Sequence, residues 1–174
     1  MITELQAHLS NYEIKPITKE NYMQVMGVYQ SNQEFFLLTE GKEATANDCF
    51  ANIDAMPPNF NKDNKFYIGL WKDGQAIALL DFLEGYPTHE SVYIGLLLIH
   101  GALHGKRLGS KIVQTLLEVS QEIGFKSARL GVLCNNTKAL TFWERMGFMK
   151  TGESTVDVGG NSLKAVTMSY CMRT

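Results

Sequence analysis

The apolar positions of this chain fall into short β-rich runs in some segments and into helical spacing in others. Residues 66–71 and 76–83 are two such runs, and the sequence Lys72-Asp73-Gly74-Gln75 between them is typical of a hairpin turn. Gly85-Tyr86-Pro87 ends the second run. A third run, residues 93–100, leads through a glycine-containing turn into an amphipathic helix.

The same patterns predict the remaining elements. Strands are expected at residues 12–17, 127–133, 148–153 and 165–172, the last two around a turn at Gly159-Gly160-Asn161. Helices are expected at about residues 21–29 and 46–56, the second inside a less regular region. Because the chain contains no repeat and no long linker, residues 1–174 are expected to form one α/β domain. Its core is a mixed sheet of six or seven strands with helices on its faces.

The turn that opens the helix after residue 105 suits a bound phosphate group. The first N–H groups of a helix lack partners inside the helix, and the helix dipole adds partial positive charge at the same end. Gly105 and Gly109 let a ligand approach the backbone closely, while Lys106, Arg107 and Lys111 supply positive charge. A ligand that carries a pyrophosphate is therefore indicated, although a purely structural strand, turn and helix would look similar.

A second helix is predicted after the strand at residues 127–133. Ala139, Phe142, Trp143 and Met146 share one face at helical spacing, and Gly147 is placed to end the helix. The two aromatic residues fit a packed core as well as a binding site. Similarly, Asn136, which precedes this helix, is suited both to cap it and to contact a ligand.

With these two motifs, the chain resembles the GNAT superfamily of N-acetyltransferases. The pyrophosphate motif of that family, Gln/Arg-x-x-Gly-x-Gly/Ala, falls on His104-Gly105-Lys106-Arg107-Leu108-Gly109, and its motif Asn-x-x-Ala-x-x-aromatic-Tyr-x-x-x-Gly-Phe falls on residues 136–148. The resemblance implies transfer of an acetyl group from acetyl-coenzyme A to an amine. It also implies a mostly antiparallel sheet whose central parallel pair, residues 93–100 and 127–133, splays open around the pantetheine arm.

The resemblance assigns the cofactor site residue by residue. The implied cofactor-binding residues are Leu97, Ile99, His104, Gly105, Lys106, Arg107, Leu108, Gly109, Ser110, Asn136, Ala139, Phe142 and Trp143. Two positions depart from the family pattern. Arg107 replaces a glycine, and we expect it to lie in the first turn of a helix, where it is unstrained. Trp143 replaces a tyrosine that protonates the departing thiolate in many members, which an indole cannot do.

The catalytic groups are less well indicated. Simple alternation along residues 93–100 places Tyr93, Gly95, Leu97 and Ile99 on one side of the strand and Ile94, Leu96 and Leu98 on the other. The resemblance assigns to the backbone N–H of Leu97 the stabilisation of the oxyanion. Tyr93 stands where some members have a glutamate base, so Asp81, Glu84 and Glu90 are the alternatives. Each of these carboxylates suits a solvated loop equally well, and solvent can also take the proton.

The acceptor is predicted only as an amine, either a small molecule or a peptide. The resemblance places its cleft along residues 29–48, with Tyr29, Asn32, Phe35, Phe36 and Glu40. Two other functions remain open on the sequence. One is a non-catalytic acyl-coenzyme A binding module, suggested by the missing tyrosine and glutamate. The other is a Rossmann-type nucleotide-binding domain, although the turn lacks the G-x-G-x-x-G pattern.

The composition indicates which partners and which cellular compartment to expect. The 174 residues are 45% hydrophobic and 20% charged, with a formal net charge of −2, so binding to nucleic acid or to a membrane surface is not expected. No run reaches the roughly 18 apolar residues that span a bilayer. Cys49, Cys134 and Cys171 lack metal-ligand spacing and are expected to be free thiols in a cytoplasmic protein. A homodimer through the two closing strands is plausible.

Overall fold

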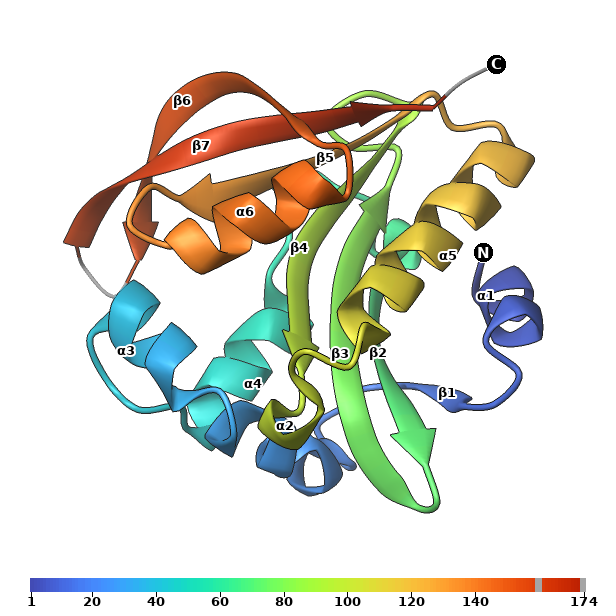
Figure 1. The fold of residues 1–174 in the computed structure, drawn as a ribbon, viewed down its shortest axis with the longest axis vertical. Coiled ribbons are helices and arrows are strands. Elements are labelled where there is room, and N and C mark those ends of the chain that lie inside the picture. The colour runs from blue at the N-terminus through green and yellow to red at the C-terminus, as the bar shows by residue number, and fades with distance from the viewer. Residues whose placement is uncertain (159–160, 173–174) are drawn as a thin grey trace.

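A computed structural model describes residues 1–158 and 161–172 (Figure 1). Within these residues one sheet has the strand order β1-β2-β3-β4-β5-β7-β6. Its strands are β1 (Glu13–Pro16), β2 (Lys65–Lys72), β3 (Gln75–Glu84), β4 (Ser91–Ile99), β5 (Ser127–Leu133), β6 (Met149–Val158) and β7 (Asn161–Cys171). Every neighbouring pair is antiparallel except β4 and β5, which run parallel. The predicted mixed sheet with a central parallel pair is therefore confirmed.

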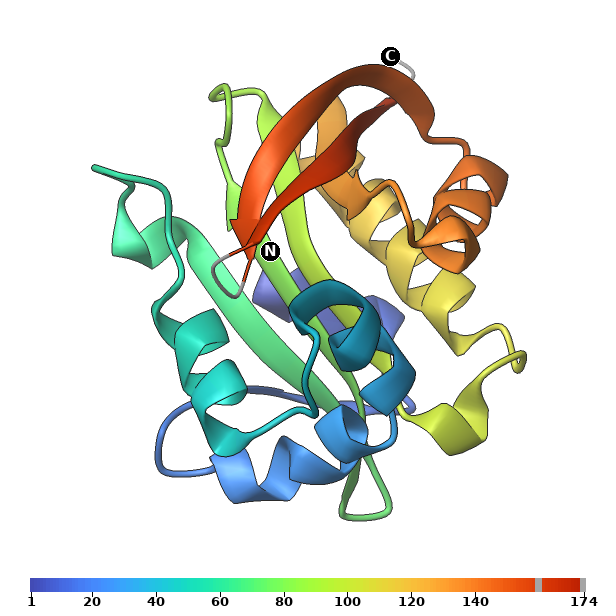
Figure 2. The ribbon, with the colours of Figure 1, turned by 90° about the vertical axis from the view of Figure 1, so that its left-hand side faces the viewer.

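Helices cover both faces of the sheet (Figure 2). The α-helices are α1 (Ile2–His8), α2 (Met26–Gln30), α3 (Gln33–Glu40), α4 (Ala46–Asp54), α5 (Leu108–Ile123) and α6 (Thr137–Arg145). Short 3-10 turns occur at η1 (Tyr22–Val25), η2 (Lys62–Asn64) and η3 (Gly101–Leu103). None of the helices in the described part of the chain is long and apolar enough to cross a membrane.

Each face has its own hydrophobic core. On one face, α1, α5 and α6 pack through residues such as Leu5, Leu116 and Trp143 against the sheet. On the other face, α2, α3 and α4 pack through Tyr29, Phe36 and Cys49. Because the central strands contribute to both cores, most of their residues are apolar, as expected for a sheet that is covered on both sides.

The parallel pairing of β4 with β5 is short. It joins Ser91–Ile94 to Ser127–Leu130, and the two strands separate beyond these residues. On its other side β4 contains a bulge, because Ile94 pairs with Phe82 while Leu96 pairs with Asp81, which leaves Gly95 as the extra residue. The bulge and the end of the pairing with β5 therefore coincide.

The bulge corrects the alternation predicted for this strand. Ile94 belongs to the core on the α5 face, whereas Leu96 and Leu98 belong to the core on the α2 face. After the bulge, Leu97 and Ile99 pack toward the α5 face. The prediction of one continuous alternation was wrong, because an inserted residue exchanges the faces of every side chain that follows it.

Other boundaries also differ from the sequence prediction. Helices α1 and α3 were not predicted, and the first predicted helix begins as the 3-10 turn η1 before it becomes α2. Strands β6 and β7 are longer than residues 148–153 and 165–172, and they pair from Met149–Ser169 to Val158–Asn161. Of the predicted turn between them, Gly159 and Gly160 lie outside the described residues.

Candidate functional site

A cavity of about 740 Å³ opens where β4 separates from β5. Its walls come from the end of β4, the turn before α5, the start of α6 and the inner side of α3. Twelve of the thirteen predicted cofactor-binding residues line this cavity: Leu97, Ile99, His104, Gly105, Arg107, Leu108, Gly109, Ser110, Asn136, Ala139, Phe142 and Trp143. Lys106 is the predicted residue that does not line it. The structure therefore brings the two sequence motifs together around one space.

The start of α5 presents unpaired N–H groups to this cavity. The first helical hydrogen bond runs from Lys111 N–H to the Arg107 carbonyl at 3.0 Å. The N–H groups of Leu108, Gly109 and Ser110 therefore precede any intrahelical partner. All three residues line the cavity. An anion placed there would meet these donors and the positive end of the dipole of a 16-residue helix.

Arg107 does not have the conformation predicted for it. It caps α5 in the left-handed region, with φ of 62° and ψ of 9°, instead of lying in the first helical turn. Gly105 has a positive φ of 76° as well. The turn thus needs left-handed backbone at the position where the family has glycine, and an arginine there is strained because its Cβ crowds the following carbonyl. Lys111 also departs from its predicted place, since its ammonium lies 5.2 Å from the centre of the Tyr12 ring.

Gly109 lies where three elements meet. A Cβ atom built on it would be 3.5 Å from Cγ1 of Ile99 and 3.5 Å from Cζ of Phe142. A methyl group therefore fits at this position, but a longer side chain has to project into the cavity or displace β4 and α6.

The end of β4 offers backbone groups to the same cavity. His100 N–H donates to Ile77 on β3 at 2.9 Å. Since alternate residues of a strand direct their polar groups to opposite edges, those of Leu97 and Ile99 point away from β3 and toward the gap. The Ile99 carbonyl already accepts hydrogen bonds from Asn32 Nδ2 at 2.9 Å and from His104 Nε2 at 2.8 Å. The N–H groups of Leu97 and Ile99 and the Leu97 carbonyl therefore face the cavity.

Residues at the start of α6 and on its inner face line the cavity and also stabilise the helix or the core. The Asn136 side chain accepts a hydrogen bond from Ala139 N–H at 3.1 Å, so the capping role is confirmed at a residue that also lines the cavity. Trp143 is 8% exposed and packs edge-on against Phe142 and Phe148, with ring centres 5.0 and 5.1 Å away. Trp143 is thus mainly a core residue with one edge in the wall.

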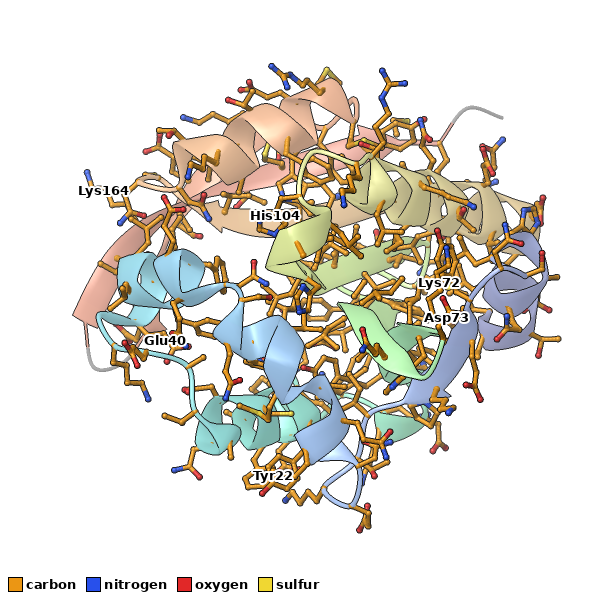
Figure 3. The ribbon with its side chains drawn as sticks, turned by 60° about the horizontal axis from the view of Figure 1, so that its bottom comes forward. Tyr22, Glu40, Lys72, Asp73, His104 and Lys164 are labelled. Carbon is orange, nitrogen blue, oxygen red and sulfur yellow. The ribbon has the colours of Figure 1, made fainter. Side chains whose placement is uncertain are left out.

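Helix α3 forms the outer wall and is tied to α6. Lys138 Nζ donates to Glu34 at 2.6 Å, and this bond holds the pKa of Glu34 below its usual value. Of the residues predicted for the acceptor cleft, Asn32 and Phe35 line the cavity, whereas Tyr29 and Phe36 are buried in the core. Figure 3 shows Glu40 at the end of α3 and His104 at the turn before α5.

Three of the four predicted catalytic residues do not line the cavity. Asp81 is buried on β3 and forms an ion pair with Lys65 at 2.7 Å. Burial raises the pKa of Glu84, and the charges that act on this residue are the N-terminal ammonium and Glu4. The Tyr93 ring packs edge-on against Tyr86, and its hydroxyl would be 3.3 Å from a Cβ atom on Gly131. Leu97 is the predicted catalytic residue that lies in the cavity.

Cys49, Cys134 and Cys171 are free, as predicted. Among residues 1–158 and 161–172 no group of three or more His, Cys, Asp or Glu side chains is arranged to hold a metal ion.

A mostly antiparallel sheet whose one parallel pair opens beside the start of a helix is the architecture of the GNAT acyltransferases. The model of the acetyltransferase (GNAT) family matches residues 25–148, and the chain belongs to this family. It is therefore an N-acetyltransferase by class. This membership favours an enzyme over a non-catalytic binding module, and the mostly antiparallel sheet excludes a Rossmann-type domain.

Individual relatives are distant. The chain is 24% identical to the uncharacterized N-acetyltransferase YdgE of Bacillus subtilis (strain 168) over 147 residues, which are 80% of this chain and 93% of that protein. An acetyltransferase from Thermus thermophilus has a similar structure, with a TM-score of 0.68, 21% identity and coverage of 92% of this chain and 97% of that one. The ribosomal-protein-S18-alanine N-acetyltransferase from Escherichia coli has a TM-score of 0.66, 12% identity and coverage of 94% and 95%. These structural similarities show the fold.

Proposed function

We propose that this protein transfers the acetyl group of acetyl-coenzyme A to a primary amine, by direct attack of the amine in a ternary complex. The observation that carries this proposal is that the open start of α5 and the unpaired edge of β4 face one cavity. The open start of α5 suits a pyrophosphate, and the unpaired edge of β4 suits an amide-bearing arm such as pantetheine.

The residues of the cavity fit such a donor. N–H groups of Leu108, Gly109 and Ser110 and the side chain of Arg107 would hold the pyrophosphate. The Leu97 backbone would pair with the arm, and its N–H is suited to stabilise negative charge on the thioester oxygen during attack. The acetyl-coenzyme A supplies an activated acyl group. The chain supplies the anion site, the positioning and the backbone donor.

Direct attack is favoured over a covalent acyl-enzyme. None of the residues that line the cavity in the described part of the chain is a cysteine. Cys49 is fully buried, and this burial raises the pKa of its thiol, which disfavours the reactive thiolate. The free thiols also fit the proposal that the enzyme works in the cytoplasm, on a soluble small-molecule or peptide amine.

Gly109→Glu tests this function, because it adds bulk and negative charge beside the proposed pyrophosphate. We expect the variant to keep its circular dichroism spectrum and melting temperature and to lose measurable binding of acetyl-coenzyme A in calorimetry. Gly109→Ala should bind nearly normally, since a Cβ atom fits there. Gly27→Glu adds the same charge to an exposed glycine of α2 outside the cavity and should bind like the wild type. Unchanged affinity in folded Gly109→Glu would refute the assignment.

A further inference from the structure

A carboxylate occupies the place where a side chain of residue 95 would lie. Gly95 is exposed, and a Cβ atom built on it would be 3.0 Å from Oδ2 of Asp81. Asp81 belongs to the neighbouring strand β3, where it pairs with Leu96. Because Gly95 has no side chain, the carboxylate reaches β4 at its bulge, and any other residue at position 95 would have to displace it.

This position is close to the proposed reaction centre. Gly95 is the first residue of β4 after the parallel pairing with β5 ends at Ile94, and it is two residues before Leu97. The side chain of Asp81 lies on the same face of the sheet as its cross-strand partner Tyr67, which belongs to the core beneath α2, α3 and α4. Neither Asp81 nor Gly95 lines the cavity, but Gly95 is two residues before Leu97, which does, and the carboxylate lies on the face of the sheet that α3 covers.

The carboxylate of Asp81 pairs with a buried lysine. Lys65 Nζ lies 2.7 Å from Oδ1 of Asp81, and the two side chains are only 6% and 9% exposed. Burial and then nearby groups, Asp81 among them, raise the pKa of the Tyr67 phenol, which keeps that phenol neutral. Removing two charges from water is costly, and apolar side chains of similar volume would often stabilise the fold equally well. A buried ion pair at the bulge of β4 is thus a costly arrangement for stability alone, which favours a functional role for it.

We propose that Asp81 is the general base of the reaction, an inference that rests on the proposed function. It receives the proton of the substrate ammonium through a water molecule at the open side of Gly95. Lys65 is a positioning residue that keeps the carboxylate ionised and directs Oδ2 toward Gly95. Glu84 and Tyr93, two other residues predicted as candidate general bases, are less suited to this role. Glu84 is under the influence of the N-terminal ammonium and Glu4, and the pKa of Tyr93 is raised by burial and by Tyr86, which makes it a poor base.

The proton balance of the step is simple. The ammonium gives one proton to Asp81 through water, and the neutral amine then forms a C–N bond with the thioester carbonyl carbon. The C–S bond breaks, and the second proton of the nitrogen leaves with the sulfur as thiol. Asp81 returns its proton to solvent, so each turnover yields one amide, one thiol and one proton.

The test measures thiol release at neutral pH with saturating acetyl-coenzyme A and three small amines of decreasing basicity: n-butylamine, glycine ethyl ester and 2,2,2-trifluoroethylamine. We expect Asp81→Asn to lower kcat about 100-fold for n-butylamine, which is nearly all protonated, and only a few-fold for trifluoroethylamine, which is already neutral. The paired variant Lys65→Met with Asp81→Asn removes both charges, and it should show the same dependence on amine basicity without leaving a lysine buried alone.

A matched glycine pair tests the position of the carboxylate. Gly95→Ala places a methyl group 3.0 Å from Oδ2 and should lower kcat for n-butylamine most strongly. Gly152→Ala, at a bulge in β6 with open space around its Cβ position, should behave like the wild type. Equal losses for all three amines would overturn the role of Asp81. Normal binding of acetyl-coenzyme A in the same proteins would leave the proposed cofactor site standing.

Discussion

The side-chain amide of Asn32 donates a hydrogen bond to the carbonyl oxygen of Ile99, 2.9 Å away, and a second one to the Val28 carbonyl at 2.8 Å. Asn32 is only 8% exposed and stands between α2 and α3. This one side chain therefore connects the α2–α3 segment to the last residue of β4, at the edge of the cavity.

Asn32→Ala should destabilise the protein because it leaves two carbonyl groups without this donor. We expect a loss of about 1–3 kcal/mol in the free energy of unfolding, measured by chemical denaturation. Asn135→Ala is the control, since its amide is exposed and lies 3.5 Å from the Leu38 carbonyl. A loss no larger than that of the control would show that the contact to Ile99 contributes nothing.

Arg107→Gly should separate backbone strain from charge. Glycine adopts the left-handed conformation of this cap at little cost, so the variant should be as stable as the wild type or more stable by about 1 kcal/mol. Its affinity for acetyl-coenzyme A should fall about tenfold, because a charged hydrogen-bond donor to the pyrophosphate is lost. Arg107→Lys keeps the charge and the strain, so calorimetry should find a smaller loss of affinity for it. Tighter binding by Arg107→Gly would contradict this account of the turn.

Trp143→Phe should leave the chemistry nearly unchanged, because an indole has no proton to transfer at neutral pH. We expect kcat to change by no more than a few-fold. Trp143→Ala should instead cost about 3–5 kcal/mol of stability, since the ring packs between Phe142 and Phe148. A large loss of kcat in a stable Trp143→Phe protein would give the indole a catalytic role.

The pH dependence of kcat/KM should report the surroundings of Asp81. Burial raises the pKa of its carboxyl, and the ammonium of Lys65 opposes this rise. The ionised form accepts the proton, so activity falls as the pH drops through this raised pKa. Lys65→Met removes the opposing charge and should move the acid limb of the profile to higher pH. Lys19→Met, which breaks an exposed pair with Asp54, should not move it. An acid limb that stays in place in Lys65→Met would argue against Asp81 as the titrating group.

Much of the site could be predicted because its motifs are local. A strand, a glycine turn and an amphipathic helix are consecutive in sequence, and so are Asn136 and the helix that it caps. The spacing of Phe142 and Trp143 also indicated a shared helical face. These features depend on residues within a few positions of one another, so a single chain is enough to find them.

The missed features depend on register and on backbone geometry. The bulge at Gly95 exchanges the faces of β4, and only the pairing of Asp81 with Leu96 reveals it. The same register brings the carboxylate of Asp81 to residue 95 and Lys65 to Asp81, which are contacts between strands. Arg107 was placed in helical backbone because arginine rarely adopts the left-handed region, although the glycine that it replaces in the family pattern was a sign of that region. Helix α3 had one usable signal, Gly41, which ends it with a φ of 70°.

Calorimetric titration of acetyl-coenzyme A into the purified wild-type protein, with NAD as the comparison ligand, tests whether the cavity binds this cofactor. We expect saturable binding of acetyl-coenzyme A at one site per chain and no binding of NAD. Absence of acetyl-coenzyme A binding, or binding of NAD alone, would contradict the assignment of the cavity and of the activity built on it.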